Sequence, residues 1–95
     1  MVVGIGTITF RLHGCRSLKA KRKIVKSIMA LLANKFNISI SEVSAHDVHQ
    51  KARIGFAIVS NDGRHVNSQL DKVIDTAEAL QLAEIVGSSS EMIYY

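Results

Sequence analysis

The sequence predicts an α+β domain whose elements follow the order β-α-β-β-α-β. Residues 17–36 carry apolar side chains at helical spacing, residues 51–60 form a β-branched run, and a second helical pattern follows at about residue 62. In this order four strands form one antiparallel sheet and both helices cover the same face, which is the ferredoxin-like arrangement. A chain of 95 residues is the size of one small domain, so residues 1–95 are expected to form a single domain.

The first two elements are a strand from Val2 to Leu12 and a helix from Ser17 to Phe36. The strand has one face of Val3, Ile5, Thr7 and Thr9 and another of Ile8, Phe10 and Leu12. Ser17 is a suitable N-cap for the helix, and Asn37 is expected to end it in a left-handed conformation. The apolar stripe of the helix consists of Leu18, Val25, Ile28, Met29, Leu32 and Phe36.

The opposite face of this helix is strongly basic. Its bases are Lys19, Arg22, Lys23 and Lys26. Lys21 projects beside the apolar stripe, and its long stem is expected to carry the charge to water. Cations near a helix N-terminus oppose the helix dipole, so the sequence predicts an anionic partner or nearby acidic residues.

The second half of the chain supplies a strand from Ile38 to Ala45, a strand from Lys51 to Ser60, a helix from Asp62 to about Leu80, and a last strand from Leu82 to Tyr95. The alternation of the first of these strands is imperfect, and a turn at Ser41-Glu42 is the alternative. Asp62 is the expected cap of that helix, and the last strand is expected to bulge near Gly87. The strand from Lys51 is apolar on both faces, which is typical of a central strand.

The two faces of that strand differ in size. The small face of Gly55, Ala57 and Val59 is expected to pack under the helices. The large face of Ile54, Phe56 and Ile58 would then lie on the bare side of the sheet. Because a large apolar patch seldom stays in water, the sequence predicts that a second copy covers it in a two-fold dimer.

The charges are distributed unevenly along the chain, whose net charge is +4. Residues 1–41 contain eight Lys or Arg and no acid, whereas the remainder contains four bases and eight acids. This asymmetry indicates a polyanion-binding face, an acidic protein partner, or internal pairing with Asp71, Asp75 and Glu78 of the second helix. The candidate nucleic-acid contacts are Arg11, Arg16, Lys19, Arg22, Lys23 and Lys26.

Enzymatic chemistry is not expected. His46 and His49 have no evident third metal ligand, and Cys15 beside His13 has no orienting group. No cofactor is predicted, because there is no glycine-rich phosphate loop. The single cysteine fits a reducing cytoplasm, and the longest apolar run is too short to span a membrane.

The chain resembles the small bacterial DUF503 (YlxP-like) proteins over nearly its whole length. The matching residues are Ser17-Leu18-Lys19, Lys21-Arg22, Phe36-Asn37-Ile38-Ser39, Glu42-Val43, Asp47, Gln50 and Gly55 to Ser60. His49 departs from the large aromatic expected there. The resemblance implies a ferredoxin-like fold similar to that of RNA-binding modules. Genes of the family commonly lie beside those for a translation initiation factor and ribosome-binding factor A, which implies a role near the ribosome.

The function favoured by these observations is binding of RNA or a ribosomal particle through the basic first helix. Residues Gly55 to Val59 are similar to the third-strand signature of an RNA recognition motif, but Ile58 stands where that motif has its second stacking aromatic. Phe10 on the first strand is the one other ring that could contribute. Base stacking on the sheet is therefore disfavoured. The alternative is a protein-interaction module that acts through a homodimeric sheet face or an acidic partner.

Overall fold

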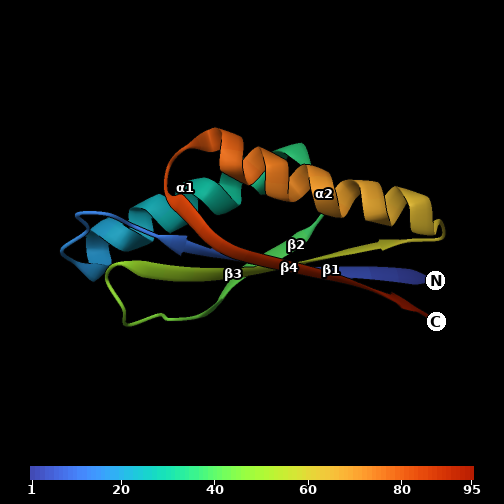
Figure 1. Cartoon of the computed structure of the whole chain (residues 1–95), viewed down its shortest axis with the longest axis horizontal. Helices are drawn as coiled ribbons and strands as arrows, with labels where there is room; N and C mark the ends of the chain where they lie inside the picture. The colour runs from blue at the N-terminus through green and yellow to red at the C-terminus, as the bar shows by residue number, and fades with distance from the viewer.

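The chain folds into one four-stranded sheet with two helices packed on one of its faces (Figure 1). The computed structural model covers residues 1–95. The elements are β1 (Val2–Arg11), α1 (Leu18–Lys35), β2 (Ser39–Ser44), β3 (Lys51–Ser60), α2 (Gly63–Leu80) and β4 (Glu84–Tyr94). The strands are ordered β2-β3-β1-β4 and every neighbouring pair is antiparallel. The predicted ferredoxin-like topology is therefore confirmed.

Local sequence signals set most of the element boundaries. The Ser17 hydroxyl accepts a hydrogen bond from the Ala20 amide at 3.1 Å, and the Asp62 carboxylate accepts one from the Arg64 amide at 2.9 Å. Both predicted N-caps are confirmed. The predicted left-handed cap at Asn37 is wrong, because α1 ends at Lys35 and its C-cap is Phe36, which is extended and buried in the core.

The predicted bulge near Gly87 is confirmed in the pairing of β4 with β1. Thr9 lies opposite Gly87, but the next residue of β1, Phe10, lies opposite Ile85. Val86 is therefore the extra residue of β4, and the bulge changes the register of the edge strand just before it reaches Glu84.

The core fills the space between the sheet and the helices. On β1 the buried face includes Ile8 and Phe10, two residues that the alternation of the strand places on the same face. The helices contribute Val25, Ile28 and Leu32 from α1 and Val66, Leu70, Val73 and Ala77 from α2. The helix layer therefore covers only one side of the sheet, and the other side is the open face.

The prediction that Ile54, Phe56 and Ile58 lie on the open face is wrong. These side chains face the helices, where their exposed fractions are 0%, 4% and 5%. The reason lies in the neighbouring strand: Gly6 of β1 pairs directly with Phe56, and the ring occupies the space that a Cβ at Gly6 would need. Because Gly6 has no side chain, the Phe56 ring fills this space in the core without a clash, and the large face of β3 points toward the helices. Because these three residues are buried under the helices, their assignment to a dimer interface is also wrong.

The open face consequently carries the small and polar residues of the central strands. Gly55 and Ala57 of β3 lie there, with the Val43 side chain packed beside Gly55. On β1 the same face carries Ile5 and Thr7, and the Thr7 hydroxyl is hydrogen-bonded to that of Ser89 at 2.7 Å. This face therefore carries smaller side chains than the predicted large face of Ile54, Phe56 and Ile58.

Candidate nucleic-acid interface

The basic face of α1 is formed by residues on the side of the helix away from the core. The buried positions Val25, Ile28 and Leu32 orient the helix against the sheet. The side chains that this orientation leaves exposed include all four predicted bases of the helix, Lys19, Arg22, Lys23 and Lys26. We refer to these four residues as the α1 basic face.

No acidic side chain neutralises the α1 basic face. The protein contains two ion pairs, Lys21–Glu42 and His13–Glu84, and neither includes a residue of this face. The predicted alternative of internal pairing with α2 does not form. Asp71 and Asp75 instead line a hollow with Ser88–Ser90 of β4, at the opposite edge of the sheet from β2.

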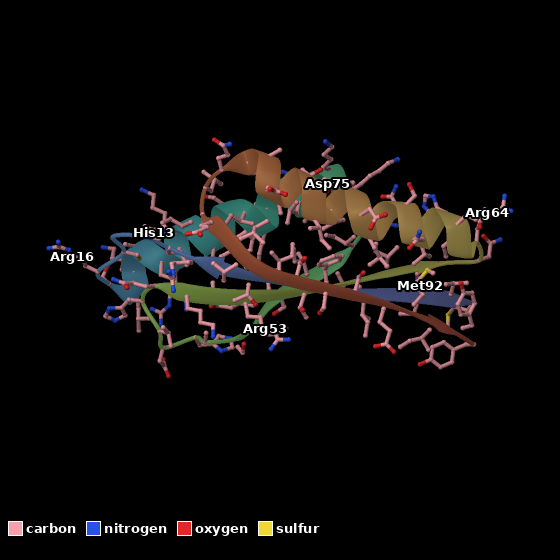
Figure 2. The ribbon with its side chains drawn as sticks, viewed as in Figure 1. His13, Arg16, Arg53, Arg64, Asp75 and Met92 are labelled. Atoms are coloured by element: carbon pink, nitrogen blue, oxygen red, sulfur yellow. The ribbon has the colours of Figure 1, made fainter.

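The two remaining predicted bases lie apart from each other. Arg16 is exposed in the connection between β1 and α1, at one tip of the elongated molecule (Figure 2). Arg11 is the last residue of β1, and the alternation along the strand places it on the open face, because its neighbour Phe10 is buried under the helices. The structure therefore brings Arg16 to the start of α1 but separates Arg11 from the helix.

Lys21 is a buried cation, although its charge was expected to reach water. Its exposed fraction is only 1%, and its Nζ lies 3.0 Å from a Glu42 carboxylate oxygen. It also donates hydrogen bonds to the carbonyl oxygens of Ala45 and His46, the second at 3.4 Å. The Lys21 ammonium thus ties α1 to the end of β2 and to the loop that follows.

The sequence held a signal for this burial. Lys21 falls on the stripe of positions 18, 21, 25, 28 and 32, which has the spacing of the buried helix face. Glu42 falls at an inward position of β2, since it pairs with the buried Ile54 of β3. A lysine and a glutamate at two inward positions of adjacent elements predict a buried ion pair.

A second polar link joins the end of β1 to the start of β4. The His13 ring is hydrogen-bonded to the Glu84 carboxylate. This hydrogen bond, helped by the positive charges of His13 and Arg11, outweighs desolvation and lowers the pKa of Glu84. Arg11, His13, Glu78 and Glu84 line one open hollow, where the two signs of charge balance each other.

The residues considered for stacking, metal binding or catalysis do not converge on a site. Phe10 and Phe56 are both buried on the helix side, so neither ring is available to stack on a base. His49 is exposed in the loop between β2 and β3, and Cys15 is a buried free thiol. No group of three or more His, Cys, Asp or Glu side chains is arranged to hold a metal ion. Neither helix combines the length and the apolarity needed to cross a membrane.

The fold places the protein among α+β sandwiches of the ferredoxin-like class. The Arabidopsis thaliana protein At3g17210 is similar with a TM-score of 0.54 at 14% identity, over 98% of this chain and 94% of that one. The de novo designed protein Foldit4 is similar with a TM-score of 0.53 at 10% identity, over 99% and 97% of the two chains. At these identities the likeness shows the fold alone.

The sequence identifies the family within that class. The model of DUF503, a family described as of unknown function, matches residues 3–90. The uncharacterized protein YlxP of Bacillus subtilis (strain 168) is 33% identical over 73 residues, which are 77% of this chain and 79% of YlxP. The chain therefore belongs to the DUF503 family.

Proposed function

We propose that the protein is a non-enzymatic, cytoplasmic RNA-binding protein that holds the phosphate backbone of RNA, free or in a ribosomal particle, through the α1 basic face. The observation that carries this proposal is that all four bases of the face are exposed and form no ion pair. In complexes with nucleic acids, exposed Lys and Arg side chains commonly bind the phosphates of the backbone.

The position of these bases supports an external anion rather than a role in helix stability. The first turn of α1 contains no acidic residue, and Lys19 lies within it. Cations there oppose the helix dipole, and each costs about 0.3–1 kcal/mol. A bound phosphate would offset this cost, because it would meet both the basic side chains and the positive end of the helix.

The direct test of this proposal is the salt dependence of RNA binding by the wild-type chain. Four phosphate contacts predict that log K falls against log[salt] with a slope of about −3 to −4, which is about a 10²-fold loss of affinity between about 50 and 200 mM salt. The measurement is a fluorescence-anisotropy titration of labelled RNA at several salt concentrations. Absence of binding at the lowest salt, or a slope near zero, would contradict the proposal.

The alternative function is protein interaction through the open face, with a second copy as the partner. Ile5, Val43 and Val59 are 38%, 50% and 65% exposed, and register places Ile5 and Val59 on the open face while Val43 packs beside Gly55 there. Sedimentation equilibrium separates the two alternatives. A dimer whose dissociation constant does not depend on salt, and which is lost in the variant Val59→Asp, favours protein interaction.

A further inference from the structure

The open face carries a second group of cations, which adjacent strands bring together at one end of the sheet. Arg11 of β1 is paired directly with Lys51 of β3, and Thr9 is paired with Arg53. Residues paired across antiparallel strands point to the same face, and the exposed Arg11, Lys51 and Arg53 alternate with the buried Phe10 and Ala52. Figure 2 shows Arg53 extending from the side of the sheet away from the helices.

This arrangement places like charges close together, which favours an external anion. Like charges directly opposite each other across two strands are destabilising, and Arg11 with Lys51 is such a pair. Glu84 lies opposite Arg11 on the other side of β1 and, although it is hydrogen-bonded to His13, it also interacts with the charge of Arg11. Neither Lys51 nor Arg53 forms an ion pair, and Asp47 in the preceding loop pairs with neither.

The surface beside these cations combines hydroxyl-bearing and small residues with the exposed apolar side chains of Val48 and Val86. Thr7 and Thr9 of β1 lie next to Ser89 and Gly87 of β4. Hydroxyl groups contact phosphates and ribose, and small residues let a sugar-phosphate chain approach the sheet closely. The aromatic rings that would select unstacked bases, Phe10 and Phe56, are buried on the helix side of the sheet.

We infer that Arg11, Lys51 and Arg53 form a second phosphate-binding surface, which takes the backbone of helical RNA without stacking on its bases. The inference rests on the proposed RNA binding and adds to it a second face and a class of RNA. Double-stranded RNA is recognised by its phosphates, its 2′-hydroxyls and its shape, which are the groups that charges and hydroxyls on this face can contact. The two surfaces lie on opposite sides of the sheet layer, so the protein contacts RNA on both.

The test compares two double variants that have the same net charge. The first is Lys51→Gln with Arg53→Gln, and the control is Arg64→Gln with Lys72→Gln on α2, where Arg64 lies at the other end of the molecule (Figure 2). The probe is an RNA duplex of roughly 20 base pairs, long enough to span a double-stranded RNA-binding site. A stiff duplex cannot reach both faces of one molecule, so each surface is expected to hold its own duplex. At saturating RNA we expect the wild type and the control to bind two duplexes per protein and the sheet variant to bind one.

Each other outcome has a defined meaning. If the two double variants bind alike while the wild type binds with a steep salt slope, the second surface is refuted and the α1 surface stands. If the wild type does not bind the duplex at any salt, the proposed function fails as well. If a single-stranded RNA of the same length binds more tightly than the duplex, helical RNA is not the occupant of the open face. The same conclusion follows if sedimentation shows that the wild type is a dimer and the sheet variant has the same RNA affinity as the wild type. Thermal midpoints of the sheet variant equal to or above wild type confirm that the loss is not due to unfolding.

Discussion

Reversing the charge of the α1 basic face is expected to abolish RNA binding by a chain that stays folded. The four substitutions are Lys19→Glu, Arg22→Glu, Lys23→Glu and Lys26→Glu. All four side chains are exposed and unpaired, so their replacement breaks no contact of the core. Glutamate near a helix N-terminus interacts favourably with the helix dipole, by about 0.3–1 kcal/mol for each residue in the first turn. The variant is therefore expected to unfold at the same temperature as the wild type or a higher one.

The size of the effect on binding follows from the number of phosphates lost. Replacing four attractive contacts by four repulsive charges is expected to lower affinity by at least about 10²-fold at low salt. The matched control compares the pair Arg22→Glu and Lys26→Glu with the pair Arg64→Glu and Lys72→Glu, which changes the net charge equally on α2. Equal loss in both pairs would mean that overall charge, and not this face, controls binding.

Replacing the buried Lys21 by alanine is expected to cause a large loss of stability. The change removes the partner of Glu42, whose side chain is 15% exposed, and leaves the Ala45 carbonyl without the Lys21 hydrogen bond. Breaking one partner of a buried ion pair costs about 3–5 kcal/mol, and the partial exposure of Glu42 places this case near the lower value. For a domain of this size, each kcal/mol lowers Tm by roughly 4–8 °C. Calorimetry measures the loss.

Two further variants separate the ion pair from simple packing. Lys23→Ala, two residues along the same helix, removes an exposed lysine and is expected to change stability by less than about 0.5 kcal/mol. The double variant Lys21→Met with Glu42→Gln removes both charges and keeps the side-chain volumes, so it is expected to recover part of the stability. If Lys21→Ala costs no more than Lys23→Ala, the pair does not stabilise the junction of α1 and β2.

The sequence predicted the topology because most elements carried a strong local signal; the strand from Ile38, with its imperfect alternation, was the exception. The hydrophobic period of α1, the β-branched run of β3 and the caps at Ser17 and Asp62 all act within a few residues. The bulge in β4 was predicted near Gly87, one residue from the inserted Val86. These features depend on neighbours in sequence, which a single chain displays directly.

The inward face of β3 was not predicted, because it depends on pairing between distant strands. Period-2 alternation separates two faces but does not say which one the helices cover. The register decides it: Phe56 lies opposite Gly6, which leaves room for the ring on the helix side. The grouping of cations on the open face was not predicted for the same reason. Arg11 and Lys51 are far apart in sequence, and only the strand register brings them together.

The most direct test of RNA binding through α1 is an NMR titration of the wild-type chain with an RNA duplex. Amide shifts and line broadening report which residues lie at the contact. The account predicts that Lys19 to Lys26 are among the most perturbed residues, and that the effects disappear at high salt because phosphate contacts are screened. Perturbations confined to α2 or the chain ends, with α1 unchanged, would contradict it.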